Sequence, residues 1–112
     1  MKIIKKPNET FVREDAHGGN GGRKLLLDDN EIKNLQGMTR GFLPVGSKFA
    51  WHNHDNFNEV MYVLKGEGTV RDEDGIYPYN EGDIFIFPKD IYHEIENTSQ
   101  EENEYIFVRV YE

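Results

Sequence analysis

The chain has 112 residues, a formal net charge of −8 and no cysteine. This length predicts one domain with one core, and the absence of cysteine excludes disulfides and thiolate metal ligands. An acidic surface repels nucleic-acid phosphates and anionic bilayers, so neither is an expected partner. No apolar run is long enough to span a membrane and the N-terminus lacks a signal-peptide core, which predicts a cytoplasmic protein.

The first 24 residues are expected to form a flexible N-terminal arm. Residues 17–22 are too glycine-rich to hold regular structure. His17 lies in this stretch, where it could fold over a binding site as an acid or base, or belong to a merely disordered arm. Residues 23–27 can form a short strand, and residues 31–36 a single helical turn.

From Gly37 onward the chain consists of short runs rich in Val, Ile, Phe and Tyr, each bounded by Gly, Pro, Asn or Asp. This pattern predicts the strands of an all-β sandwich or barrel, which we place at residues 25–112 as a single domain. Asp74 and Gly75 predict a two-residue hairpin turn, because both tolerate a positive φ. The predicted strands are residues 38–43, 48–54, 59–65, 69–71, 76–79, 84–87, 92–96 and 105–111.

Three histidines and one glutamate form a candidate metal site. His52 and His54 are two residues apart, so on one strand their imidazoles share a face. Glu59 lies an odd number of residues further on, but the turn-forming residues 55–58 can break the strand and turn its carboxylate inward. His93 follows another hairpin. Isolated histidines are more often surface or core residues, yet three of the four histidines in the chain fall at these positions. Three nitrogens and one carboxylate suit one divalent transition metal: Mn, Fe, Ni, Co, Cu or Zn.

These residues resemble the two sequence motifs of the cupin superfamily. The first motif, G(x5)HxH(x3-4)E(x6)G, is matched by Gly46, His52, His54, Glu59 and Gly66. The second, G(x5)PxG(x2)H(x3)N, is matched by Gly82, Pro88, His93 and Asn97. Asp90 stands where the second motif has glycine, and aspartate is among the residues that best tolerate the left-handed conformation.

The resemblance implies a double-stranded β-helix, or jelly-roll cupin barrel, usually a homodimer. It also implies that His52, His54, Glu59 and His93 are the metal ligands inside the barrel. Residues 17–21 and 93–98 are further similar to small cupins called oxalate-decarboxylase-like. Oxalate decarboxylases have two cupin domains, however, and this chain has one.

Strand alternation predicts what surrounds the metal. If Glu59 faces inward, Met61 and Val63 do so too, and the same parity from His93 turns Ile91 and Ile95 inward. The cavity around the ion is then largely apolar, as is usual for a small-molecule site.

We name three candidate substrate-binding residues: Met61, Arg40 and Arg109. Both arginines lie in apolar strands, where a charge is unfavourable unless it is paired or exposed. The alternative for Arg109 is a position facing solvent or an acidic neighbour. The sequence leaves open which face of residues 105–111 lines the cavity. Apolar outer faces around Tyr62, Leu64 and Phe107 predict a homodimer.

Two functional classes follow for the site. The first, which we favour, is a metalloenzyme that acts on a small carboxylate or other polar small molecule by decarboxylation, oxidation or isomerisation. It requires a proton-transfer group besides the ligands, for which His17, Glu67, Glu94 or a tyrosine are candidates. The alternative is a non-catalytic module that binds a sugar or small acid through the metal. A storage cupin ranks last, because all four ligands are present.

Overall fold

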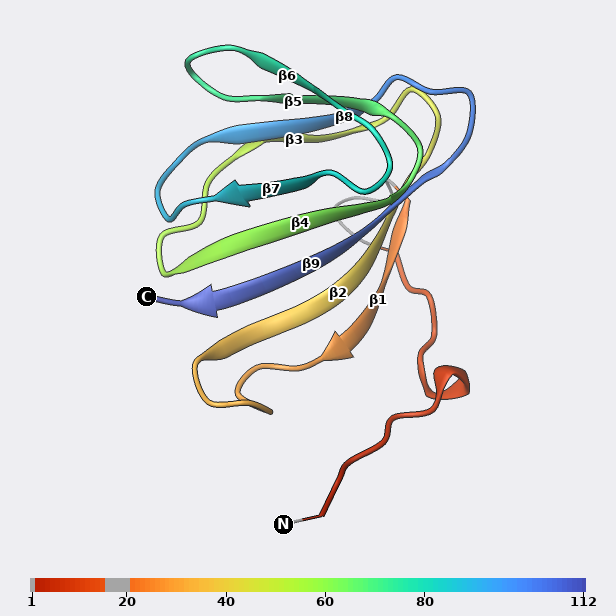
Figure 1. The fold of residues 1–112 in the computed structure, drawn as a ribbon, viewed down its shortest axis with the longest axis vertical. Helices are drawn as coiled ribbons and strands as arrows, with labels where there is room; N and C mark the ends of the chain where they lie inside the picture. Colours follow the sequence, from red (N-terminus) through yellow and green to blue (C-terminus); the bar gives the residue numbers. More distant parts are fainter. Residues whose placement is uncertain (1, 16–20) are drawn as a thin grey trace.

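The structure, a computed structural model, describes residues 2–15 and 21–112. Within them, nine strands form two antiparallel sheets that face each other (Figure 1). The five-stranded sheet has the order β1-β2-β9-β4-β7 and the four-stranded sheet the order β3-β8-β5-β6. The strands are β1 Gly22–Leu27, β2 Leu35–Leu43, β3 Lys48–His52, β4 Phe57–Lys65, β5 Gly68–Arg71, β6 Ile76–Tyr79, β7 Ile84–Phe87, β8 His93–Asn97 and β9 Asn103–Tyr111. The predicted all-β jelly-roll fold is confirmed.

The predicted helical turn at residues 31–36 is wrong. β2 already begins at Leu35. Asn30 and Asn34 have φ angles of 60° and 71°, and this left-handed conformation interrupts a right-handed helix. The segment between β1 and β2 is therefore a pair of turns that reverses the chain.

The hairpin predicted around Asp74 and Gly75 is present between β5 and β6, but its turn type is wrong. Neither residue has a positive φ. The Asp72 carboxylate instead accepts hydrogen bonds from the backbone N–H groups of Asp74 and Gly75, and the Asp72 N–H donates to the Gly75 carbonyl. An aspartate side chain that bonds the backbone two residues on closes the loop without left-handed residues.

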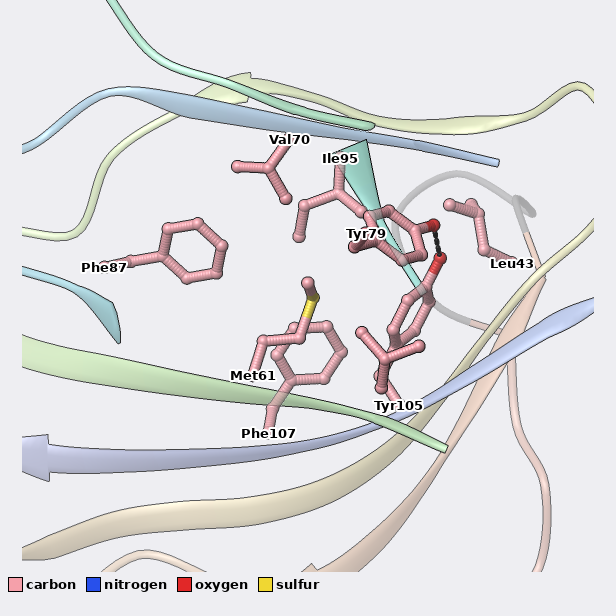
Figure 2. Packing of buried hydrophobic residues seen from close by; sticks show 9 residues of the cluster. Leu43, Met61, Val70, Tyr79, Phe87, Ile95, Tyr105 and Phe107 are labelled. Carbon is pink, nitrogen blue, oxygen red and sulfur yellow. Dashed lines mark hydrogen bonds between the residues drawn. The ribbon is translucent and has the colours of Figure 1, made fainter. Parts of the chain in front are cut away.

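The hydrophobic core lies between the two sheets (Figure 2). Met61 and Val63 are fully buried while Tyr62 is 40% exposed, so the predicted alternation along β4 is confirmed. On β9 the inward residues are Tyr105, Phe107 and Arg109, which settles the parity that the sequence left open. The core cluster comprises Leu43, Met61, Val63, Val70, Tyr79, Phe87, Ile95, Tyr105 and Phe107.

Two of the predicted orientations are wrong. Ile91 is 45% exposed, because β8 begins only at His93 and the alternation does not extend back into the preceding turn. Phe107, which we expected on the outer face, is buried in the core. The outer apolar face of the five-stranded sheet instead carries Tyr62, Leu64, Ile84, Ile86 and Val110.

A buried polar cluster lies at one end of the core. The hydroxyl groups of Tyr79 and Tyr105 are 2.5 Å apart, and Asn103 Nδ2 donates to the Tyr79 oxygen. Burial raises the pKa of both phenols. Asn97, the last residue of the second motif, donates from Nδ2 to the carbonyls of Leu43 and Glu101. Its role is thus to hold the chain at this end rather than to bind a metal.

The N-terminal segment extends away from the sheets (Figure 1) but contacts β1 and two of the loops. Lys6 pairs with Glu31, and Arg13 makes two hydrogen bonds to the Glu102 carboxylate. Glu14 exchanges two backbone hydrogen bonds with Arg23 of β1. The predicted flexible arm over residues 1–24 stays a prediction, and His17 lies outside the described residues.

The described part of the chain contains no helix with the length and hydropathy that a membrane crossing requires.

Candidate metal centre

The four predicted ligands come together between the two sheets. His52 ends β3, His93 begins β8, and the two are directly paired in the four-stranded sheet. Phe49 and His52 are three residues apart, so a regular strand would point them to opposite faces. A register shift between them lets both Phe49 and His52 face inward. Glu59 comes from β4 of the opposite sheet. The expected break between His54 and Glu59 is present, but it begins earlier than predicted: β3 ends at His52, His54 lies beyond it, and β4 starts at Phe57.

The distances between these side chains suit a shared metal ion. One ring nitrogen each from His52, His54 and His93 lies within 4.8 Å of the others. Glu59 Oε1 is 3.6 Å from His54 Nε2 and 3.8 Å from His93 Nε2. Glu59 and His93 are 6% and 1% exposed. His52 and His54 are half-buried. A carboxylate and three imidazoles this close together form a set that a cation would satisfy.

The hydrogen bonds of the rings leave the Nε2 atoms available. His52 Nδ1 lies 2.6 Å from the Ala50 carbonyl, and His93 Nδ1 lies 3.1 Å from the Ile91 carbonyl. Nδ1 is therefore the protonated nitrogen in both rings, and Nε2 keeps its lone pair. Nε2 of His54 and of His93 are buried and have no hydrogen-bond partner among the described residues. These histidines therefore fit a metal that would bind their Nε2 atoms.

Burial of His93 has an electrostatic consequence. It lowers the pKa of the imidazole to about 4, so that the ring is neutral at neutral pH. A neutral imidazole is the form that binds metals. The ring stacks on Phe87 with 4.0 Å between centroids, and His54 stacks similarly on Phe57 at 4.3 Å, which fixes both ring planes.

The two segments that carry the histidines are joined through their backbones. The Asp90 N–H donates to the His54 carbonyl at 2.7 Å, and the Lys89 N–H donates to Asn58 Oδ1 at 2.7 Å. Asp90 has a φ of 71°, so the expectation that aspartate can replace the motif glycine in a left-handed turn is confirmed.

A cavity of about 440 Å³ opens beside this group. Along the cavity, β2 places the small residues Gly37, Thr39 and Gly41 inward, opposite the large side chains of β9. A Cβ atom at Gly41 would lie 2.8 Å from the Phe107 ring. The residues lining the cavity are Gly22, Arg23, Gln36, Thr39, Gly41, Lys48, Phe49, Ala50, Trp51, His52, His54, Phe57, Glu59, Ile95, Phe107 and Arg109.

Arg109 faces the cavity next to the metal ligands. Its Nη1 lies 3.6 Å from Glu59 Oε2, and it donates from Nε to Gln36 Oε1 and from Nη1 to Thr39 Oγ1. Burial lowers the pKa of the guanidinium; Glu59 opposes this effect, and the positive charge of Arg23 adds to it. The acidic neighbour that we considered as an alternative for Arg109 is thus Glu59 itself, inside the cavity.

The structure places the other two candidate substrate-binding residues outside the cavity lining. Arg40 points to the outer side of β2, where it pairs with Glu104. Met61 is part of the hydrophobic core, and neither residue is among the described residues that line the cavity. Glu94 pairs with Lys48 and Arg71 on the other face of β8.

Sequence reasoning missed several residues that line the cavity, among them Arg23, Gln36 and Thr39. β1 and β2 reach the cavity only because β2 pairs with β9, far along the chain. All three residues also precede the region covered by the sequence motifs, which begins at Gly46. The small residues that alternate on β2 were a sign of open space beside that strand. Only the strand order shows that this space is the cavity.

The sequence and the fold both have relatives among known proteins. A family model described as "Cupin domain" matches residues 40–109. An uncharacterized protein from Methanocaldococcus jannaschii is 32% identical over 87% of this chain and 78% of its own length. An oxalate-binding protein from Thermotoga maritima is 35% identical over 84% of this chain and 80% of its own length.

Solved structures agree. A crystal structure of a predicted oxalate decarboxylase from Thermotoga maritima superimposes with a TM-score of 0.81 at 26% identity, covering 91% of this chain and 92% of that one. Ectoine synthase from P. lautus also reaches a TM-score of 0.81, at 19% identity over 96% of this chain and 78% of its own; this likeness shows the fold alone.

Proposed function

This chain belongs to the cupin domain family, and we propose that it binds one divalent transition metal through His52, His54, Glu59 and His93 and a small carboxylate beside that metal. The observation that carries the proposal is the pair of buried, unpartnered Nε2 atoms of His54 and His93 next to the Glu59 carboxylate. The donor set suits Mn, Fe, Ni, Co, Cu or Zn, and the bound metal would act as a Lewis acid toward ligand oxygens.

The charges around the cavity support an anionic ligand. Arg23 and Arg109 line it, and Glu59 is the one carboxylate among the described lining residues; Lys48 also lines it, but its amine pairs with Glu94 on the other face of β8. This excess of positive charge occurs in a protein whose formal net charge is −8. The name of the oxalate-binding relative from Thermotoga maritima supports the same class of ligand. We therefore propose a carboxylate rather than a sugar.

The lining favours binding over turnover. Decarboxylation or isomerisation needs a group that transfers a proton besides the metal ligands. The acidic and imidazole side chains among the described lining residues, His52, His54 and Glu59, all belong to the ligand set. A metalloenzyme is the second candidate, and the structural likeness to a predicted oxalate decarboxylase supports it.

Elemental analysis of the purified protein tests the metal site. We expect about one divalent transition metal per chain in the wild type and a strong loss in the His52→Ala variant. His17→Ala is the matched control, because it removes the one histidine outside the ligand set and should leave the metal content unchanged. Equal metal content in the wild type and His52→Ala would refute the site.

Calorimetric titration of the metal-loaded protein with oxalate then tests ligand binding. Assays of carbon dioxide release and oxygen consumption with a panel of small acids separate the two functional classes. Release or consumption that depends on the metal would establish an enzyme, whereas saturable binding without turnover supports the binding module. A homodimer and a cytoplasmic location remain predictions.

A further inference from the structure

The cavity is larger than the smallest dicarboxylate requires. Its volume is about 440 Å³, whereas a water molecule occupies about 30 Å³ in the liquid. Oxalate bound at the metal would fill only a small part of this space. The remainder extends along the inner face of β2, over Thr39 and Gly41, toward β1.

A second arginine faces this remote part. Arg23 on β1 is paired with Gly41, and Arg109 on β9 is paired with Gly37, so the two flank Thr39 from opposite ends. Their backbone positions are four residues apart along β2, which is about 13 Å at 3.3 Å per residue. Because Gly41 has no side chain, the Arg23 side chain can reach inward over it.

Arg23 is only partly neutralised by its neighbours. Its Nε is buried and has no hydrogen-bond partner among the residues that the structure describes. The same Nε lies 3.4 Å from Glu14 Oε1 in an ion pair, with the Arg23 and Glu14 side chains 43% and 57% exposed, and such a surface pair is weak. Arg109 forms an ion pair with Glu59. A bound metal would also attract this carboxylate and would therefore weaken its pairing with Arg109. Two guanidinium groups that face one cavity are suited to bind an anion that carries two carboxylates.

We propose that Arg23 and Arg109 form a two-arginine subsite that selects a dicarboxylate longer than oxalate. This inference rests on the proposed function, since one carboxylate of the ligand lies beside the metal and Arg109. The second carboxylate extends along β2 to Arg23. Arg23 precedes the region that matches the family model, residues 40–109, whereas Arg109 is the last residue of that region.

The test compares acetate, oxalate and succinate on protein loaded with Co²⁺, whose visible absorption reports on its ligands. We expect succinate to bind more tightly than acetate in the wild type. Arg23→Gln should weaken succinate binding about tenfold or more, because one charge-assisted hydrogen bond is lost, and should leave acetate binding unchanged. Arg23→Lys should restore part of the difference.

Lys24→Gln is the matched control. It removes a positive charge from the next residue of the same strand, which points to the opposite face and is not among the described residues lining the cavity. We expect it to bind both anions like the wild type. Thermal unfolding and Co²⁺ uptake, measured for every variant, separate loss of the subsite from loss of the fold.

The outcomes are distinguishable. If Arg23→Gln loses acetate and succinate affinity equally, or behaves like Lys24→Gln, the subsite is refuted while metal-dependent binding stands. If Co²⁺ binds but no anion does, the metal site stands, and both the carboxylate ligand of the proposed function and the subsite are refuted. If Co²⁺ does not bind, the metal proposal fails, and succinate titration of the metal-free wild type and Arg23→Gln proteins still decides the subsite, with equal affinities refuting it.

Discussion

Acidification of the metal-free protein should destabilise it through His93. The pKa of this imidazole is about 4 in the folded protein and about 6.5 in an unfolded chain. Between these values the unfolded chain binds a proton that the folded protein does not, so stability falls as pH falls from 6.5 to 4 and changes no further below 4 on this account. At 1.36 kcal/mol per pH unit the loss is roughly 3 kcal/mol.

Urea unfolding of chelator-treated protein at a series of pH values measures this loss. His93→Asn is the comparison, because it removes the titrating group while other acid-sensitive groups remain. Hydrogen bonds from Lys6 and Arg13 lower the pKa values of Glu31 and Glu102. These two groups therefore contribute to the acid sensitivity of both proteins alike. The wild type should therefore lose about 3 kcal/mol more than the variant between pH 6.5 and 4. Parallel curves for the two proteins would show that His93 is not held neutral by burial.

Two further predictions concern the fold and the assembly. Gly66→Ala should lower the free energy of unfolding by about 3 kcal/mol or more, because Gly66 has a φ of 94° and its Cβ would lie 1.6 Å from Asn103 Oδ1. Gly46→Ala, with a φ of 73° and open space around the Cβ, should lower it by only about 1 kcal/mol; equal losses in urea unfolding would contradict the steric argument. Light scattering should give twice the chain mass of 13.1 kDa, and Ile86→Lys on the exposed outer face should shift it toward the monomer. A wild-type mass near 13.1 kDa would refute the homodimer.

The strands and the positions of the histidines could be predicted because their signals are local. Alternation placed Met61 and Val63 correctly, since both lie within one uninterrupted strand. The same reasoning failed for Ile91, because the strand starts only at His93, one residue later than predicted, and Ile91 lies in the preceding turn. The turn type of the hairpin between β5 and β6 was also mispredicted. The sequence predicted left-handed residues at Asp74 and Gly75, whereas the Asp72 side chain closes this loop.

The shape of the cavity could not be predicted, since it depends on which strands are neighbours. Phe107 and Arg109 belong to the inner face, but the alternation along residues 105–111 is compatible with either face. Only the pairing of β9 with both β2 and β4 brings Arg109 beside Glu59. Arg23 enters the same space through the pairing of β1 with β2, which no sequence motif records.

The backbone hydrogen bond from Asp90 to His54 means that the spacing of the ligands is built into the main chain. The loop that precedes His93 cannot separate from the loop that carries His54 unless this bond breaks. An arriving ion therefore meets a prepared set of donors and need not gather them. Binding then costs little conformational entropy. Metal exchange requires movement of the ligand side chains and of water, and it does not require the two loops to open.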